Sequence, residues 1–381
     1  MTATPSDLLH RSLAIADSYL EPIVELTSRL TSIPAPSNDE LERSAALQGI
    51  LEGMGHEGVS VDEIGNVTAR IPGKDRSKTL LVAAHIDTVF PRDVNLTVRR
   101  EGSTLHAPGV GDNTVAVATV AHLRAAFEEL GEMPACDIVV TGNVGEEGLG
   151  DLRGMKAVVG SLPGIVGAIA VEGQSLGTVV HDAVGSKRYL VTVTGPGGHS
   201  WGAAGTPSAV HYLARLIARM DDIPLSEHPK TSFNTGTFHG GISVNTISPE
   251  AHALLDMRSV SAESLQELVA RVDEVLASPA PDGIHVGIEI VGDRPAGSQP
   301  EDGVLVRIAD QVLIDLGIRP RHRASSTDAN VPIALGIPSI CIGVTNGDNV
   351  HREDEYINLQ PIPTGFAHLI TVILQAAEAL V

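Results

Sequence analysis

Cysteine and aromatic residues are scarce in this chain of 381 residues. Its two cysteines, Cys136 and Cys341, lie in or beside apolar runs without CxxC spacing, which argues against a disulfide framework or a thiolate zinc site. Aromatic residues make up 3% of the chain, which leaves few side chains for stacking on nucleic-acid bases. Buried free thiols are typical of a reducing compartment, so we expect a cytoplasmic protein.

Positive charge is also scarce, because 26 Lys and Arg residues stand against 47 Asp and Glu residues and leave a net charge of -21. This charge repels phosphates, so we expect neither nucleic acid nor an anionic membrane surface as a partner. The first 21 residues lack the apolar core of a signal peptide, and no stretch is expected to reach membrane-spanning length. A solvated surface explains the acidity, and charge alone names no partner.

The length exceeds that at which one hydrophobic core usually stops growing, so two domains are expected. Apolar residues recur at helical spacing in some segments, and short apolar runs alternate with these segments. The alternation predicts an α/β fold, with helices flanking a mixed sheet. The predicted helices are 6–30, 39–54, 114–130 and 304–316, and the predicted strands are 59–61, 66–71, 79–84, 137–141, 165–171 and 339–342.

The pattern changes after residue 187 and predicts a separate, inserted domain. Its elements follow the order βαββαβ, which is the ferredoxin-like pattern. We expect one discontinuous catalytic domain of residues 1–184 and 295–381, and an inserted domain of residues 185–294. The predicted strands of the insertion are 189–194, 232–238, 251–258 and 285–291, and its predicted helices are 207–220 and 261–276.

Several imidazole and carboxylate side chains follow apolar strands or lie in glycine-rich turns. His85 and Asp87 end the first such strand and point the same way, so Asp87 can orient the imidazole. Asp112 follows Gly109-Val110-Gly111 just before a helix, where a helix cap is the simpler explanation. A dinucleotide-binding turn is disfavoured, because Val115 occupies the position of the third glycine.

Two adjacent acids, Glu146 and Glu147, lie between Gly145 and Gly148. A solvated loop would explain them, but the pair also suits a metal site in which one carboxylate binds the ion and the other moves a proton of the attacking water. Glu172 and His351 again come after short apolar strands. Strand ends can bring all these donors to one sheet edge, so their joint occurrence predicts a two-metal hydrolase.

This order of donors, together with the inserted domain, closely resembles the M20 family of co-catalytic zinc peptidases and deacylases. The resemblance implies a zinc-exopeptidase-like fold and two divalent ions bridged by Asp112, with His85 and Glu172 completing one site. It also implies Glu146 as general base, Asp87 as the residue that orients His85, and a cis peptide after Asp112. The implied metal ligands are His85, Asp112, Glu147, Glu172 and His351.

Segments of the inserted domain extend the resemblance. His199, in Gly197-Gly198-His199-Ser200, is similar to a lid histidine that stabilises the oxyanion, although a turn histidine is the alternative. Asn245 and Arg258 resemble the pair that grips substrate carboxylate and carbonyl groups, and a surface ion pair is the alternative for Arg258. Ser326 lies in a loop similar to that of the tripeptidase-like (peptidase T-like) branch. The resemblance also implies that the insertion is a lid and forms a homodimer.

Three functions are compatible with these residues. The first is a metallopeptidase that trims short peptides, and the second is a deacylase of N-acyl amino acids with the same metal centre. The third is a non-catalytic metal-binding or peptide-binding protein, against which the presence of Glu146 beside Glu147 counts. Zinc is the expected metal, with cobalt or manganese as alternatives. The segment 106–113 departs from the Arg-Gly-x-x-Asp-x-Lys-Gly sequence of many relatives, so the substrate class depends on other residues.

Overall fold

The computed structural model describes residues 5–381 and divides the chain into two compact units. The first unit comprises Met1–Ala183 and Gln299–Val381, and the second comprises Val184–Ser298. The chain therefore returns to the first unit after Ser298, slightly later than the expected boundary at residue 294. The two units have separate hydrophobic cores and are described in turn.

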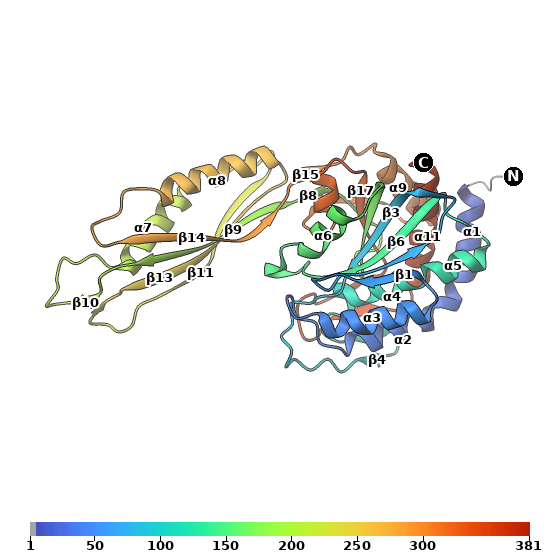
Figure 1. Cartoon of the computed structure of the whole chain (residues 1–381), viewed down its shortest axis with the longest axis horizontal. Helices are drawn as coiled ribbons and strands as arrows, with labels where there is room; N and C mark the ends of the chain where they lie inside the picture. The colour runs from blue at the N-terminus through green and yellow to red at the C-terminus, as the bar shows by residue number, and fades with distance from the viewer. Residues whose placement is uncertain (1–4) are drawn as a thin grey trace. The chain divides into compact units, whose positions relative to one another are not determined.

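A mixed sheet in the order β1-β2-β6-β3-β7-β17-β8 forms the centre of the first unit, and β16 pairs with β8 (Figure 1). Strands β6, β3, β7 and β17 are parallel, whereas β2 is antiparallel to β6. The fold class predicted from the sequence is confirmed for this unit. The strands are β1 (Glu57–Val61), β2 (Val67–Ile71), β3 (Asp75–His85), β6 (Cys136–Asn143), β7 (Ile165–Glu172), β8 (Thr178–Ala183), β16 (Arg321–Ser325) and β17 (Ser339–Gly343).

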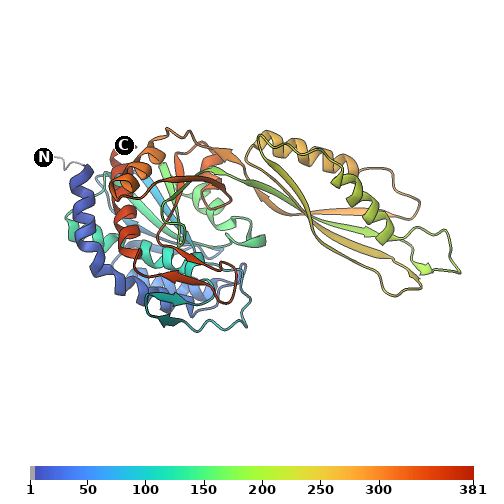
Figure 2. The same ribbon diagram turned by 180° about the vertical axis from the view of Figure 1, so that it is seen from behind.

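Helices cover both faces of this sheet (Figures 1 and 2). Leu80 and Val82 of β3 belong to the main core, while Leu81 and Ala83 pack in a smaller core with α6 and α10. A strand covered on both faces needs apolar residues at every position, which explains the continuous apolar run. The helices are α1 (Pro5–Ala16), η1 (Asp17–Tyr19), α2 (Leu20–Thr31), α3 (Leu41–Gly53), α4 (Val115–Ala121), α5 (Leu123–Leu130), α6 (Arg153–Ser161), α9 (Val304–Asp315), α10 (Asn330–Ala334) and α11 (Ile362–Ala379).

Two predicted helices are interrupted. The predicted helix 6–30 contains the 3₁₀ turn η1, where the Ser18 hydroxyl donates to the carbonyl of Ile15 at 2.6 Å. The predicted helix 114–130 breaks at His122, whose Nδ1 lies 2.7 Å from the carbonyl oxygen of Ala118. In both places a side chain bonds a backbone carbonyl of the preceding turn, which perturbs the helix.

A small second sheet in this unit was not predicted from the sequence. Its strands, in the order β18-β19-β5-β4, are only two or three residues long, too short to show a period. They bring the segment after β17 beside the segment that precedes Asp112. Their bounds are β4 (Arg99–Glu101), β5 (Thr104–His106), β18 (Gly347–Asp348) and β19 (Tyr356–Asn358).

The expectation that no stretch reaches membrane-spanning length is wrong for α11 on length and composition alone. This helix has 18 residues and a mean hydropathy of 1.2, which is enough to cross a membrane. However, 78% of it is buried inside the protein, and Phe366, Ile370 and Ile373 belong to the main core.

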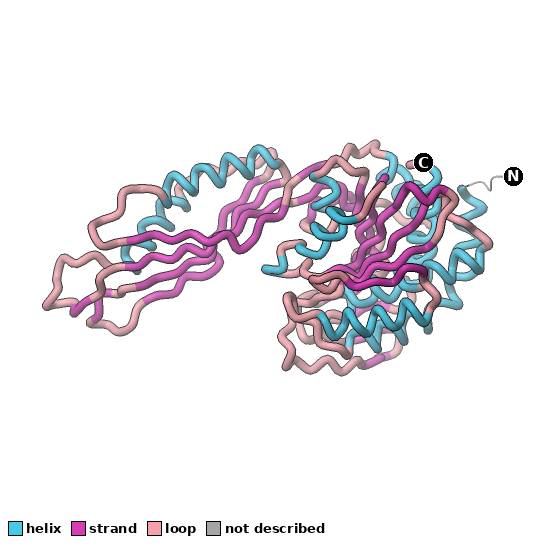
Figure 3. The backbone as a smooth tube through the Cα atoms, in the orientation of Figure 1, coloured by secondary structure: helices cyan, strands magenta, loops and turns pink. Residues whose placement is uncertain are grey.

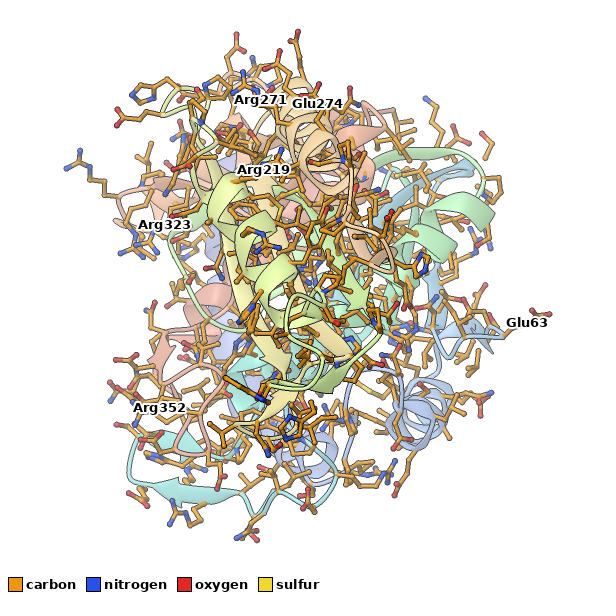
Figure 4. All side chains as sticks on the ribbon, turned by 90° about the vertical axis from the view of Figure 1, so that its left-hand side faces the viewer. Glu63, Arg219, Arg271, Glu274, Arg323 and Arg352 are labelled. Carbon is orange, nitrogen blue, oxygen red and sulfur yellow. The ribbon has the colours of Figure 1, made fainter. Side chains whose placement is uncertain are left out.

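The second unit follows the predicted βαββαβ order. Its sheet has the antiparallel order β11-β13-β9-β14, and α7 and α8 cover one face of it (Figure 3). Arg219, Arg271 and Glu274 on these helices are exposed (Figure 4). The elements are β9 (Gly185–Thr194), β10 (Gly198–His199), α7 (Ala209–Asp221), β11 (Thr231–Gly240), β12 (Thr246–Ile247), β13 (Glu250–Ser259), α8 (Ala262–Leu276), β14 (His285–Arg294) and β15 (Gly297–Ser298).

Candidate metal centre

Four of the five metal donors predicted from the sequence lie at, or in loops after, the carboxyl ends of four parallel strands. His85 is the last residue of β3 and Glu172 is the last residue of β7. Glu147 follows β6, and His351 follows β17. Parallel strands end at a common edge of a sheet, which is where α/β proteins usually bind ligands.

Asp112 lies between two imidazoles. Its Oδ1 is 3.1 Å from Nε2 of His85, and its Oδ2 is 3.1 Å from Nε2 of His351. The same Nε2 of His351 is 3.0 Å from Oε1 of Glu147. On the other side, Oε2 of Glu172 is 3.8 Å from Nε2 of His85. The five side chains thus form one chain of nitrogen and oxygen atoms with Asp112 in the middle.

This donor set fits divalent ions of the zinc kind. Ligand atoms of His85, Asp112 and Glu147 lie within 4.8 Å of one another, and imidazole and carboxylate are typical zinc ligands. Hydrogen bonds with Asp112 and Glu147 raise the pKa of His351 to about 10, and burial raises the pKa of Glu172 to about 7. Without a bound ion, protons on these two side chains offset the concentrated negative charge of the carboxylates. A bound cation can offset the same charge.

Asp87 contacts His85 through both its backbone oxygen and its carboxylate. Nδ1 of His85 lies 3.1 Å from the backbone oxygen of Asp87 and 3.5 Å from its Oδ1, so the backbone is the nearer acceptor. The carboxylate also accepts the N–H groups of Glu146 and Glu147 at 2.9 and 3.0 Å and the hydroxyl of Ser37 at 2.6 Å. Asp87 therefore holds the turn that carries both glutamates.

Residues 81–375 match peptidase family M20/M25/M40. The chain belongs to this family. It is therefore a hydrolase that acts on peptide or amide bonds, as the sequence analysis predicted.

Three proteins, one compared by sequence and two by structure, resemble this chain over most of its length. A succinyl-diaminopimelate desuccinylase from Corynebacterium glutamicum is 27% identical over 352 residues, which cover 90% of this chain and 93% of that protein. A tripeptidase structure from Staphylococcus aureus has a TM-score of 0.79 at 21% identity, covering 94% of this chain and 99% of the other. A dinuclear metal-binding M20 peptidase from Bacillus subtilis has a TM-score of 0.69 at 16% identity, covering 95% and 99%. The tripeptidase and the dinuclear peptidase therefore share the fold of this chain.

Three buried residues that support the M20 centre were not found by sequence analysis. Glu355 accepts hydrogen bonds from the backbone N–H groups of Gly109, Gly111 and Asp112, each at 2.8 Å. Glu355 is completely buried, although it ends a run of acids, Glu353-Asp354-Glu355, that reads as a surface loop. Periodicity carries no signal for such a carboxylate, because its partners are distant in sequence.

The other two supporting residues hold strand ends. Asn113 donates to the carbonyl of Val171 at 2.8 Å and accepts the N–H of Gly173 at 2.7 Å, so it brackets Glu172. The bond Asp112–Asn113 is cis, as the resemblance implies. Nη1 of the buried Arg43 donates to the carbonyl of Ile86 at 2.8 Å, and Ile86 lies between His85 and Asp87. Burial lowers the pKa of Arg43 to about 10.

Three predicted site residues belong to the second unit. His199 is exposed on β10, and its Nδ1 accepts the backbone N–H groups of Trp201 and Gly202 at 3.2 and 3.3 Å. Asn245 is exposed and its Oδ1 accepts the hydroxyl of Ser243 at 3.0 Å. Arg258 donates through Nε to Asp256 at 2.6 Å, which is the ion pair considered as the alternative. Ser326 lies in the first unit, between β16 and α10.

A cavity of about 230 Å³ adjoins the metal centre within the first unit. Glu172 lines it together with Thr327, Cys341 and an arginine that the sequence analysis missed, Arg323. Arg323 is exposed and is labelled in Figure 4. The cavity therefore combines the carboxylate of Glu172, a predicted metal ligand, with a guanidinium that can receive an anionic group.

Proposed function

We propose that this M20 hydrolase trims short peptides at two divalent metal ions, with zinc as the first choice. The position of Asp112 between His85 and His351 carries the proposal, because one carboxylate can then ligate two ions. We assign His85 and Glu172 to one ion, Glu147 and His351 to the other, and Asp112 to both. When bound, the ions supply Lewis acidity to the scissile carbonyl and to the attacking water.

We assign the general base to Glu146. This glutamate is 7% exposed, and its backbone is held by the Asp87 carboxylate beside that of Glu147. Glu146 takes a proton from water as the water oxygen bonds to the carbonyl carbon, and it delivers that proton to the amine nitrogen as the C–N bond breaks. A protein that only bound metal or peptide would not need this second carboxylate.

His199 is proposed to stabilise the negative charge that develops on the carbonyl oxygen. Because its Nδ1 accepts N–H groups of Trp201 and Gly202, the neutral ring carries its hydrogen on Nε2. That N–H is a donor of the type needed at an oxyanion. Replacing His199 by Ala should lower kcat more than it changes KM, and an unchanged kcat would refute the role.

We propose that the substrate carries a free carboxylate, because Arg323 lines the cavity beside Glu172 and a guanidinium can bind a carboxylate. We propose further substrate contacts from Asn245, Arg258 and Ser326. A second candidate, deacylation of an N-acyl amino acid, uses the same centre and is favoured by the desuccinylase relative, which is 27% identical.

Mass spectrometry separates these functions. Purified enzyme with zinc would receive a mixture of dipeptides, tripeptides and N-acyl amino acids, with and without chelator. Chelator-sensitive loss of peptides would support the peptidase, and loss of only the N-acyl compounds would support the deacylase. Absence of any product from zinc-loaded protein would favour the non-catalytic alternative. The Glu146→Gln variant provides the matched control for contaminating hydrolases.

We also propose a homodimer formed by the second unit. A groove of about 610 Å³ between α7 and the edge strand β11 is lined by Ile217, Phe233 and Phe238. Phe238 is 40% exposed, and an open strand edge with apolar neighbours favours association. Sedimentation equilibrium should find a dimer that Phe238→Asp weakens, and a wild-type monomer at all concentrations would refute the proposal.

A further inference from the structure

A second cluster of possible metal ligands lies in the first unit. His181 on β8, His322 on β16 and Glu301, just before α9, each place one ligand atom within 4.8 Å of the others. Strand β16 pairs in parallel with β8, so the two histidines lie on neighbouring strands. Their rings meet edge to face, with centroids 5.0 Å apart.

This cluster lies on the other side of the sheet from the cavity described above. Side chains alternate between the two faces along a strand. Thr178 and Val180 of β8 and Arg323 of β16 line the cavity. His181 occupies the alternate position on β8, and His322 contacts the His181 ring and bonds Asp310 of α9, so both lie on the opposite face, which α9 covers. The cluster is therefore distinct from the Asp112 centre.

Each histidine ring is already oriented by an oxygen acceptor. Nδ1 of His181, a residue only 3% exposed, donates to the backbone oxygen of Gln299 at 2.9 Å. Nε2 of His322 donates to the carboxylate of Asp310 on α9 at 2.9 Å. These bonds leave a lone pair on Nε2 of His181 and on Nδ1 of His322. Histidines that ligate metals are commonly held in this way, with the second ring N–H given to a carbonyl or carboxylate.

We propose that His181, His322 and Glu301 form a further divalent-metal site, selective for ions such as zinc that prefer imidazole with carboxylate. Ring packing and the ion pair with Asp310 would explain the two histidines alone, and a solvated surface would explain Glu301 alone; a metal site explains why the three ligand atoms lie together. Two nitrogen donors and one oxygen donor suit zinc, with a fourth position left for water.

The position of the site gives it a structural consequence. The chain leaves the first unit after Ala183 and returns at Gln299. His181 precedes the exit and Glu301 follows the return, so a bound ion ties both segments to β16. Because an ion that binds only the folded protein stabilises it, zinc at this site raises the unfolding temperature of the first unit.

The test measures zinc content in the full chain after dialysis against a zinc buffer, for wild type, His322→Asn and Glu301→Gln. Both replaced side chains are exposed, so these variants should fold. We expect each to retain one equivalent of zinc fewer than wild type and to gain less in unfolding temperature when zinc is added. His211→Asn, which changes an exposed histidine on α7, is the control and should retain the wild-type zinc content.

Two results would overturn the site. One is equal zinc content and equal thermal shift in wild type, His322→Asn and Glu301→Gln. The other is the same loss of zinc in His211→Asn, which would mean that surface histidines bind the ion without a defined site.

Discussion

Glu355 and Asp112 are joined by a 2.8 Å hydrogen bond between the Glu355 carboxylate and the Asp112 backbone N–H, although 243 positions separate them in sequence. The same carboxylate also accepts the N–H groups of Gly109 and Gly111. One buried side chain thereby fixes the backbone of the loop that presents the proposed bridging ligand.

Replacing Glu355 by Gln should weaken metal binding. The amide has one acceptor oxygen instead of two and turns an NH₂ group toward backbone donors, so the Asp112 loop loses its fixed position. We expect zinc affinity to fall about 10-fold to 100-fold, the usual effect of removing a residue that supports a metal ligand. Competition with a chromophoric chelator measures this affinity. The exposed Glu353→Gln is the control, and wild-type affinity in Glu355→Gln would contradict the role.

Replacing Glu146 by Gln should separate catalysis from metal binding. Without a carboxylate to move the proton, kcat should fall by about 10²-fold to 10⁴-fold, while zinc content stays at the wild-type value. In Glu147→Gln, by contrast, zinc content itself should fall, because a ligand is changed. Elemental analysis and steady-state kinetics on the same samples give both quantities. Substantial turnover in Glu146→Gln would remove that residue from the mechanism.

Arg323→Gln should reduce affinity for substrates that have a free carboxylate. A lost hydrogen bond to a charged group costs about 1.5–3 kcal/mol, so KM should rise about 10-fold to 100-fold. Peptides whose C-terminal carboxylate is replaced by an amide should show no such rise. Arg352→Gln is a matched control, because Arg352 is exposed and pairs with Asp354. An equal KM in wild type and Arg323→Gln would exclude Arg323 from substrate binding.

His368 should make the fold sensitive to acid. Burial lowers the pKa of this α11 histidine to about 4 in the folded protein, whereas the unfolded chain has its ordinary value of about 6.5. Above pH 6.5 both states are neutral, so stability is unaffected. As pH falls from 6.5 to 4 only the unfolded state gains the proton, which removes about 3 kcal/mol of stability.

Urea unfolding with chelator present checks this prediction without interference from metal loss. His368→Gln keeps an N–H donor for the carbonyl of Ala309 and removes the titratable ring. Its stability should fall less than that of wild type between pH 7 and pH 4.5. His10→Gln, at an exposed site on α1, is the control substitution. An equal loss of stability between pH 7 and pH 4.5 in wild type and His368→Gln would show that His368 does not cause the sensitivity to acid.

Local patterns were enough to predict the strands that carry the metal donors. Strand β3 ends with the apolar run 80–84 before His85, and β7 is the apolar run 165–171 before Glu172; both features are visible within ten residues. The prediction of a mixed sheet flanked by helices followed from the alternation of strands and helices. The order of the donors and the βαββαβ insertion then pointed to the M20 family.

Only the tertiary structure decided which acidic side chains are buried and which partner each of them bonds. Glu355 is buried while Glu353 is exposed, because β19 pairs with β5 and carries the preceding residue against the Asp112 loop. The same is true of the carboxylate of Asp87, which bonds the turn of Glu146 more closely than it bonds His85. The sequence by itself determined the residue types and the strands that deliver them. Burial and pairing depend on segments far apart in the chain, so they appeared only when those segments packed together.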